Sequence, residues 1–107
     1  MDLSRSKCKP CEGGTKPFNA AEAKKYMKFA KGWHLKRGSI TAERKFKDFK
    51  EAMSFVVKVG RIAESEGHHP DISIHGWNKV TLTLSTHAIK GLSINDFILA
   101  SKINRIR

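Results

Sequence analysis

Two kinds of hydrophobic spacing alternate along this chain. Apolar residues that recur every three or four positions predict amphipathic helices at about 19–32, 48–66 and 93–106. Each predicted helix opens with a polar residue followed three positions later by an acidic one, which is typical of an N-terminal capping box. These pairs are Asn19 with Glu22, Asp48 with Glu51, and Ser93 with Asp96.

The other segments alternate apolar and polar residues, which predicts strands. Residues 33–37 and 40–47 flank Gly38-Ser39 as a hairpin would, and 72–74 and 80–85 flank a turn at 75–78. We therefore predict an α+β fold, a four-stranded antiparallel sheet with three helices packed on one face. The opposite face carries threonines and is polar enough for water or for another subunit.

Length and leading sequence suggest one domain. A chain of 107 residues buries one core and has no room for a second. Residues 1–17 hold two of the three prolines and two of the eight glycines, so we expect a flexible N-terminal arm before a single domain at 18–107.

No apolar run approaches the ~20 residues of a membrane span, and no signal peptide is visible. We expect a cytoplasmic protein.

The chain is strongly basic, with 21 Lys and Arg against 10 Asp and Glu and a net charge of +11. Such an excess favours anionic partners, nucleic acid among them. The basic residues are scattered, however, and the densest group has few aromatic neighbours: Lys24, Lys25, Lys28 and Lys31. We therefore favour a solvated basic surface over a nucleic-acid interface.

Cys8 and Cys11 form a lone Cys-x-x-Cys. A structural zinc site needs four ligands, and no second pair is present. A thioredoxin-type pair follows a strand and opens a helix, whereas this pair lies in the irregular arm. We expect two reduced thiols, while adventitious metal binding or oxidation remains open.

The sequence His68-His69-Pro70, together with His87, is the main candidate for chemistry. Imidazole titrates near neutrality and exchanges protons at cellular pH. His68 and His69 follow a predicted helix end, where they either cap the helix or serve a site, and Glu64 can face His68 one turn earlier. The strand period places His87 at a strand end, on the side opposite the core.

Other kinds of chemistry find less support in the residues. Three histidines can bind zinc, but adjacent histidines rarely converge on one ion, and no His-x-x-x-His is present. No Ser or Cys has a recognisable nucleophile setting. We expect an acid–base site that uses neither a metal nor a cofactor.

Several motifs stand in a fixed order along the chain: Gly32-Trp33, Phe46-Lys47-Asp48-Phe49, Glu64-x-x-x-His68-His69-Pro70, Asn78-Lys79-Val80, Leu84-Ser85-Thr86-His87 and Gly91-Leu92-Ser93-x-x-Asp96. In this order they resemble the pterin-4a-carbinolamine dehydratase family over nearly the whole chain. The arm also resembles the Cys-x-x-Cys-x-Gly-Gly segment of many bacterial members.

The resemblance implies a function and a set of site residues. Members dehydrate 4a-hydroxytetrahydropterin, left when an aromatic amino-acid hydroxylase uses its pterin, to quinonoid dihydropterin. The implied catalytic residues are His68, His69 and His87. Positions that line or support the pterin site are Glu64, Ser85, Thr86 and Asp96, with Trp33 at its edge.

The resemblance also leaves alternatives open. Ile72 and Asn95 replace an aromatic residue and an arginine of better-known animal members, and the segment after Pro70 is one residue longer, so the rim of the site and its selectivity differ. Relatives are dimers or tetramers, so a homodimer or homotetramer is implied. The competing hypotheses are a binding or coactivator-type module, since animal relatives stabilise transcription-factor dimers through a helix, and an enzyme for another pterin.

Overall fold

The sheet has the four antiparallel strands that the sequence predicts. The computed structural model describes residues 3–8 and 16–106. The strands are β1 (His34–Lys36), β2 (Ser39–Lys45), β3 (Asp71–His75) and β4 (Lys79–Leu84), in the order β1-β2-β4-β3. Each hairpin pairs its own two strands, and β2 joins β4 between them, so β4 lies inside the sheet.

Three α-helices accompany this sheet in the described part of the chain: α1 (Ala20–Tyr26), α2 (Phe49–Glu66) and α3 (Ile94–Asn104). Short 3-10 turns add η1 (Leu3–Arg5), η2 (Met27–Phe29) and η3 (His87–Ile89). The first helix is shorter than predicted, because its last turn tightens into η2. Asn19 and Ser93 form full capping boxes, but Asp48 forms half of one, since Glu51 turns to the backbone N–H of Lys47.

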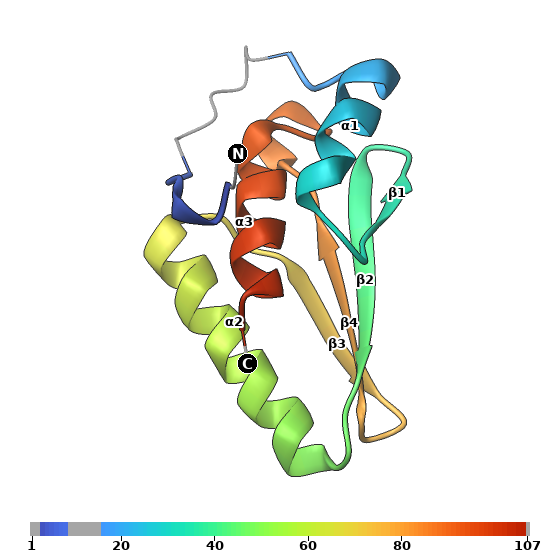
Figure 1. The fold of residues 1–107 in the computed structure, drawn as a ribbon, viewed down its shortest axis with the longest axis vertical. Helices are drawn as coiled ribbons and strands as arrows, with labels where there is room; N and C mark the ends of the chain where they lie inside the picture. Colours follow the sequence, from blue (N-terminus) through green and yellow to red (C-terminus); the bar gives the residue numbers. More distant parts are fainter. Residues whose placement is uncertain (1–2, 9–15, 107) are drawn as a thin grey trace.

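The core lies between the sheet and the helices on one side of it (Figure 1). Ile40 and Ala42 of β2 and alternate residues of β4 are buried, as the strand period predicts. Helix α3 is buried almost all round, because it contacts α2, η1 and η2 and packs into the same core as the strands. Burial, expected on one apolar face, therefore extends over most of the helix and includes Asn95, Asp96 and Ser101, whose polar groups need partners inside the fold.

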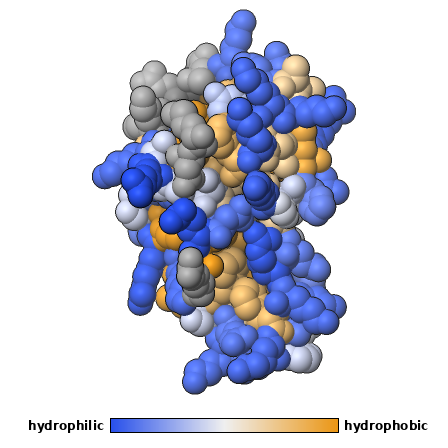
Figure 2. Space-filling model, in the orientation of Figure 1, coloured by the Kyte–Doolittle hydropathy of each residue, from blue (hydrophilic) through white to orange (hydrophobic). Residues whose placement is uncertain are grey.

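The molecular surface is largely polar. Hydrophilic residues cover most of the face seen in Figure 2, and apolar residues show along its middle. On the far side of the sheet from the core, the threonines of β2 and β4 remain half-buried. Among the described residues, none of the helices has the length and apolar character that a membrane span requires.

Candidate active site

His68 and His69 lie where α2 ends and the chain turns into β3. Gly67 adopts the left-handed conformation (φ 66°), and its N–H and that of His68 bond to carbonyls of the last helical turn. Glycine adopts this geometry without steric cost, so the helix stops there. Pro70 then directs the chain into an extended strand.

The two histidines have different partners. His68 Nε2 lies 2.6 Å from Oδ1 of Asp96, and the His68 side chain is only 11% exposed. The more exposed His69 bonds through Nε2 to Oε1 of Glu64 at 2.8 Å. The expectation that Glu64 faces His68 was thus wrong, because Gly67 ends the helix before a further turn could align the two residues.

Asp96 is completely buried, and its carboxylate both caps α3 and bonds His68. Its Oδ2 accepts hydrogen bonds from the Ser93 N–H (2.9 Å) and the Thr86 hydroxyl (2.8 Å), while Oδ1 holds His68. The acidic residue of a capping box therefore also fixes an imidazole that lies 28 positions away in the sequence. Buried carboxylates are costly unless hydrogen-bonded, and these contacts supply the bonds.

His87 is presented by a small closed loop after β4. Thr86 and Gly91 pair as an isolated β-bridge (Thr86 N–H to Gly91 O, 2.7 Å), and η3 lies between them. His87 is the first residue of η3 and is exposed. The bridge fixes both ends of the loop, so the imidazole projects from a defined position.

These elements surround a hollow of about 520 Å³. Five predicted site residues line it: His68, His69, Ser85, Thr86 and His87. Glu64 and Asp96 reach it through the histidines that they bind. Trp33 is not brought there, because it is 4% exposed in the core and donates its Nε1–H to Asn104 at 3.0 Å.

Sequence reasoning missed three lining residues, Cys8, Glu66 and Asp71, whereas Asn95, which the resemblance associated with the rim of the site, does line the hollow. Cys8 comes from the N-terminal segment, and its backbone N–H donates to Oε1 of Glu66 at 2.8 Å. Leu3 of the same segment is buried in the core. Local sequence patterns carry no signal for contacts between residues 58 positions apart. Cys11 lies outside the described residues.

The Cys8 thiol donates to the backbone carbonyl of Asn95, with 3.6 Å between the heavy atoms. Burial, and next the nearby Glu66 charge, raise the pKa of Cys8 to about 12. The thiol therefore stays protonated at neutral pH and acts as a neutral wall of the hollow. In the described part of the chain, no three His, Cys, Asp or Glu side chains are grouped to hold a metal ion.

Comparison with known proteins places this geometry in a family. The family model for pterin 4 alpha carbinolamine dehydratase matches residues 16–106. The chain belongs to this family. A protein of Azoarcus sp. (strain BH72) named "Putative pterin-4-alpha-carbinolamine dehydratase" is 45% identical, over 98% of this chain and 91% of its own length. A relative of the same name from Methylococcus capsulatus is 42% identical, over 97% and 92%.

A solved structure supports the same assignment. The crystal structure of a "transcriptional coactivator/pterin dehydratase from Brucella Melitensis" superposes with a TM-score of 0.76 and 32% identity, covering 83% of this chain and 96% of that one. The family and fold predicted from the sequence are thus confirmed. The family model begins at residue 16, so the Cys8 segment that lines the hollow lies outside it.

Proposed function

We propose that this chain dehydrates 4a-hydroxytetrahydrobiopterin, a pterin-4a-carbinolamine, to quinonoid dihydropterin and water. The observation that carries the proposal is the convergence of His68, His69 and His87, from two distant segments, on one hollow. A volume of about 520 Å³ is suitable for a small bicyclic substrate. Membership of the dehydratase family supports the same activity.

The reaction moves protons and breaks one bond. An acid protonates the hydroxyl on C4a, the C4a–O bond breaks and water leaves. A base removes the proton from N5, and the electron pair left there forms the C4a=N5 double bond. One protonated and one neutral imidazole supply both groups near neutral pH.

The contacts suggest different roles for the three histidines. Asp96 engages Nε2 of His68, which suits a fixed positioning group. His87 has no ring hydrogen bond to other described residues, so both of its nitrogens are available to substrate. His69 keeps Nδ1 available beside its bond to Glu64. We assign proton exchange with the substrate to His69 and His87.

The remaining predicted site residues shape the pterin site. Ser85 and Thr86 line the hollow next to His87, while their hydroxyls donate within the protein, to the Gly38 carbonyl and to Asp96 at 2.8 Å each. Glu64 orients His69. A reaction that oxidises a tetrahydropterin to its 4a-hydroxy form must supply the substrate. An aromatic amino-acid hydroxylase does so, and the dehydratase then serves tetrahydrobiopterin recycling, which we place in the cytoplasm.

A dehydration assay tests this function. Freshly generated 4a-hydroxytetrahydrobiopterin is followed by its ultraviolet absorbance with wild type, His69→Ala, His87→Ala and the control His34→Ala. His34 is exposed on β1, away from the hollow. We expect the two site variants to lose about a hundredfold to ten-thousandfold in kcat/KM, and the control to keep wild-type activity. Wild-type turnover no faster than buffer would overturn the proposal.

A second candidate, a binding module, is favoured by an exposed apolar stripe on α2. Phe49, Met53 and Val57 stand four positions apart and are 53%, 40% and 47% exposed. Residues at this spacing share one helix face, which suits a partner helix or a second copy of this chain in a homodimer or homotetramer. Light scattering of wild type and Met53→Glu checks this surface. The same low mass for both proteins would count against assembly through it.

A further inference from the structure

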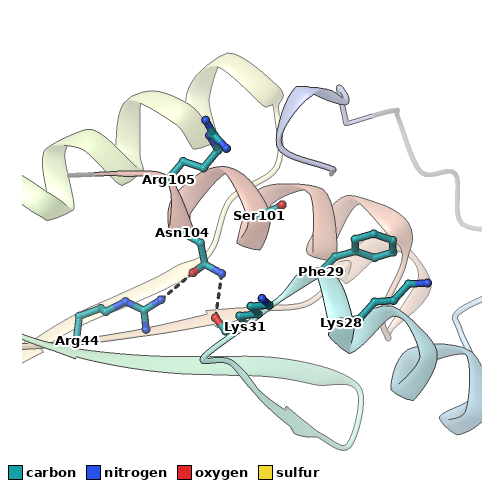
Figure 3. Close-up of a pocket in the computed structure, with 7 residues that line it drawn as sticks. All are labelled: Lys28, Phe29, Lys31, Arg44, Ser101, Asn104 and Arg105. Atoms are coloured by element: carbon teal, nitrogen blue, oxygen red, sulfur yellow. Dashed lines mark hydrogen bonds between the residues drawn. The ribbon is translucent and has the colours of Figure 1, made fainter. Parts of the chain in front are cut away.

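A second hollow, of about 660 Å³, lies beside η2, β2 and the C-terminal end of α3. It shares none of its described lining residues with the histidine hollow. Four of its seven lining residues are cationic and none is acidic (Figure 3): Lys28, Lys31, Arg44, Arg105, Phe29, Ser101 and Asn104. Its volume falls within the range of small-molecule sites.

Arg44 is the most informative of these cations. Its side chain is half-buried, and burial lowers the pKa of Arg44 from its ordinary value. Its hydrogen bonds within the described residues go to neutral oxygens, the Asn104 amide (2.8 Å) and the Glu43 carbonyl (3.4 Å). Glu51 lies in a neighbouring hollow but pairs with Lys47 at 3.8 Å. A partly desolvated cation without a carboxylate gains from an anionic ligand.

Asn104 holds this cation in place. Its Oδ1 accepts from Arg44 and from the indole N–H of the buried Trp33, and its Nδ2 donates to the Lys31 carbonyl at 2.9 Å. In Figure 3 the amide stands between Arg44 and Lys31. The Arg44 group is therefore tied to the core, and a preordered donor costs less entropy when a ligand binds.

Helix capping does not account for the cluster. Arg105 is the C-cap of α3: its backbone N–H bonds carbonyls of the last helical turn, and a basic side chain there suits the helix dipole. Arg44, in contrast, comes from a strand and bonds a side-chain amide. The aromatic ring of Phe29, with Lys28 Nζ 5.1 Å from its centroid, adds an apolar wall beside the charges.

We propose that this hollow binds a small phosphate ester, with its phosphate at Arg44 and Lys31 and its organic part against Phe29. The guanidinium presents a planar pair of N–H donors that matches two phosphate oxygens, and the Lys31 ammonium adds a second positive charge. The organic part fills space that a bare phosphate leaves empty. The site is independent of pterin dehydration, because it lies on other residues.

Calorimetric titration of the full chain with AMP and with inorganic phosphate tests the site. We expect saturable AMP binding that is tighter than phosphate binding. Arg44→Gln and Lys31→Gln should each weaken AMP binding roughly tenfold or more, the loss of one charge-assisted contact. Lys31→Gln keeps the backbone carbonyl that Asn104 uses, so it tests the charge without disturbing that contact. The control is Lys24→Gln on the exposed side of α1, outside the hollow.

The controls separate a built site from a diffuse basic surface. An equal loss of affinity in Lys24→Gln, or no saturable binding of AMP, would overturn the proposal. If AMP binds no more tightly than inorganic phosphate, the proposed contact between the organic part of the ester and Phe29 is wrong. A single-stranded oligonucleotide serves as the third ligand. If it binds more tightly than AMP and all three variants weaken it alike, with a steep dependence on salt, an extended nucleic-acid surface replaces the site.

Discussion

At the scale of single residues, Asp96 shows how one side chain serves both fold and site. It completes the cap of α3, accepts a hydrogen bond from Thr86 and orients His68. The sequence indicated the cap, because Ser93 and Asp96 have the capping spacing. The bond to His68 had no local signal, since it depends on how the end of α2 meets the start of α3.

Replacement of Asp96 tests this double role. Asp96→Asn keeps the size but removes the charge from three hydrogen bonds, so we expect a loss of roughly 2 kcal/mol in the free energy of unfolding. The matched control is Asp48→Asn at the N-cap of α2, where Asn caps as well as Asp and the change should stay near zero. Urea denaturation measures both. Equal midpoints for the two variants would contradict the assignment.

At the scale of elements, the loop that carries His87 depends on close packing at Gly91. A Cβ at this position would lie 2.6 Å from Cβ of Pro17, closer than side chains approach. Gly91 also pairs with Thr86, so a shift here moves η3 and its histidine. The glycine is required by this contact and not by an unusual backbone angle.

Gly91→Ala is therefore expected to destabilise the protein by about 1–3 kcal/mol, through overpacking. In a Pro17→Gly background the clashing atom is absent, so most of this cost should disappear, and thermal or urea unfolding of the four proteins measures the coupling. Gly60→Ala is the control, because a Cβ there meets nothing within 4 Å and alanine favours the helix. A penalty at Gly91 that is unchanged by Pro17→Gly would refute the contact.

At the scale of the whole molecule, the chain's N-terminal segment closes back onto its last helix. Leu3 enters the core, and Lys102 of α3 donates to the Ser4 carbonyl at 2.8 Å. Lys102 also pairs with Glu66 at 3.7 Å, and Glu66 accepts from the Cys8 N–H. The flexible arm remains a prediction for residues 1–17 as a whole, but residues 3–8 contact the body of the fold.

Thiol reactivity reports this docking. In a Cys11→Ser background, the raised pKa of Cys8 should make alkylation by iodoacetamide at mildly alkaline pH at least roughly tenfold slower than in the urea-unfolded chain. The positive charge of Lys102 lowers the pKa of Cys8, so its removal alone would slow the reaction further. If Lys102 anchors the N-terminal segment, Lys102→Met should be alkylated faster than its Cys11→Ser parent, because residues 3–8 are released. Slower alkylation than in the parent would show that Lys102 does not anchor the segment.

The same thiol sets a pH dependence of stability. The pKa of Cys8 is about 12 in the folded protein, above the ordinary value of 9.0 that we expect on unfolding. Its contribution is therefore complete below about pH 9 and is lost as the pH rises from 9 toward 12. Urea titrations on either side of pH 9 should show a smaller loss for Cys8→Ser than for its Cys11→Ser parent. Parallel losses would contradict the buried thiol.

The sequence by itself determined the fold class and the order of the elements, because hydrophobic period, capping pairs and glycine or proline breaks are local properties. Its motifs also indicated His68, His69 and His87 as candidate site residues. Only the tertiary structure decided which carboxylate holds which histidine. In the structure Trp33 lies in the core and not at the edge of the site, and Cys8 and Glu66 line the hollow. Arg44 and Lys31 line the second hollow together. Such contacts join residues far apart in the chain, and they depend on how helix ends and strand ends meet in space.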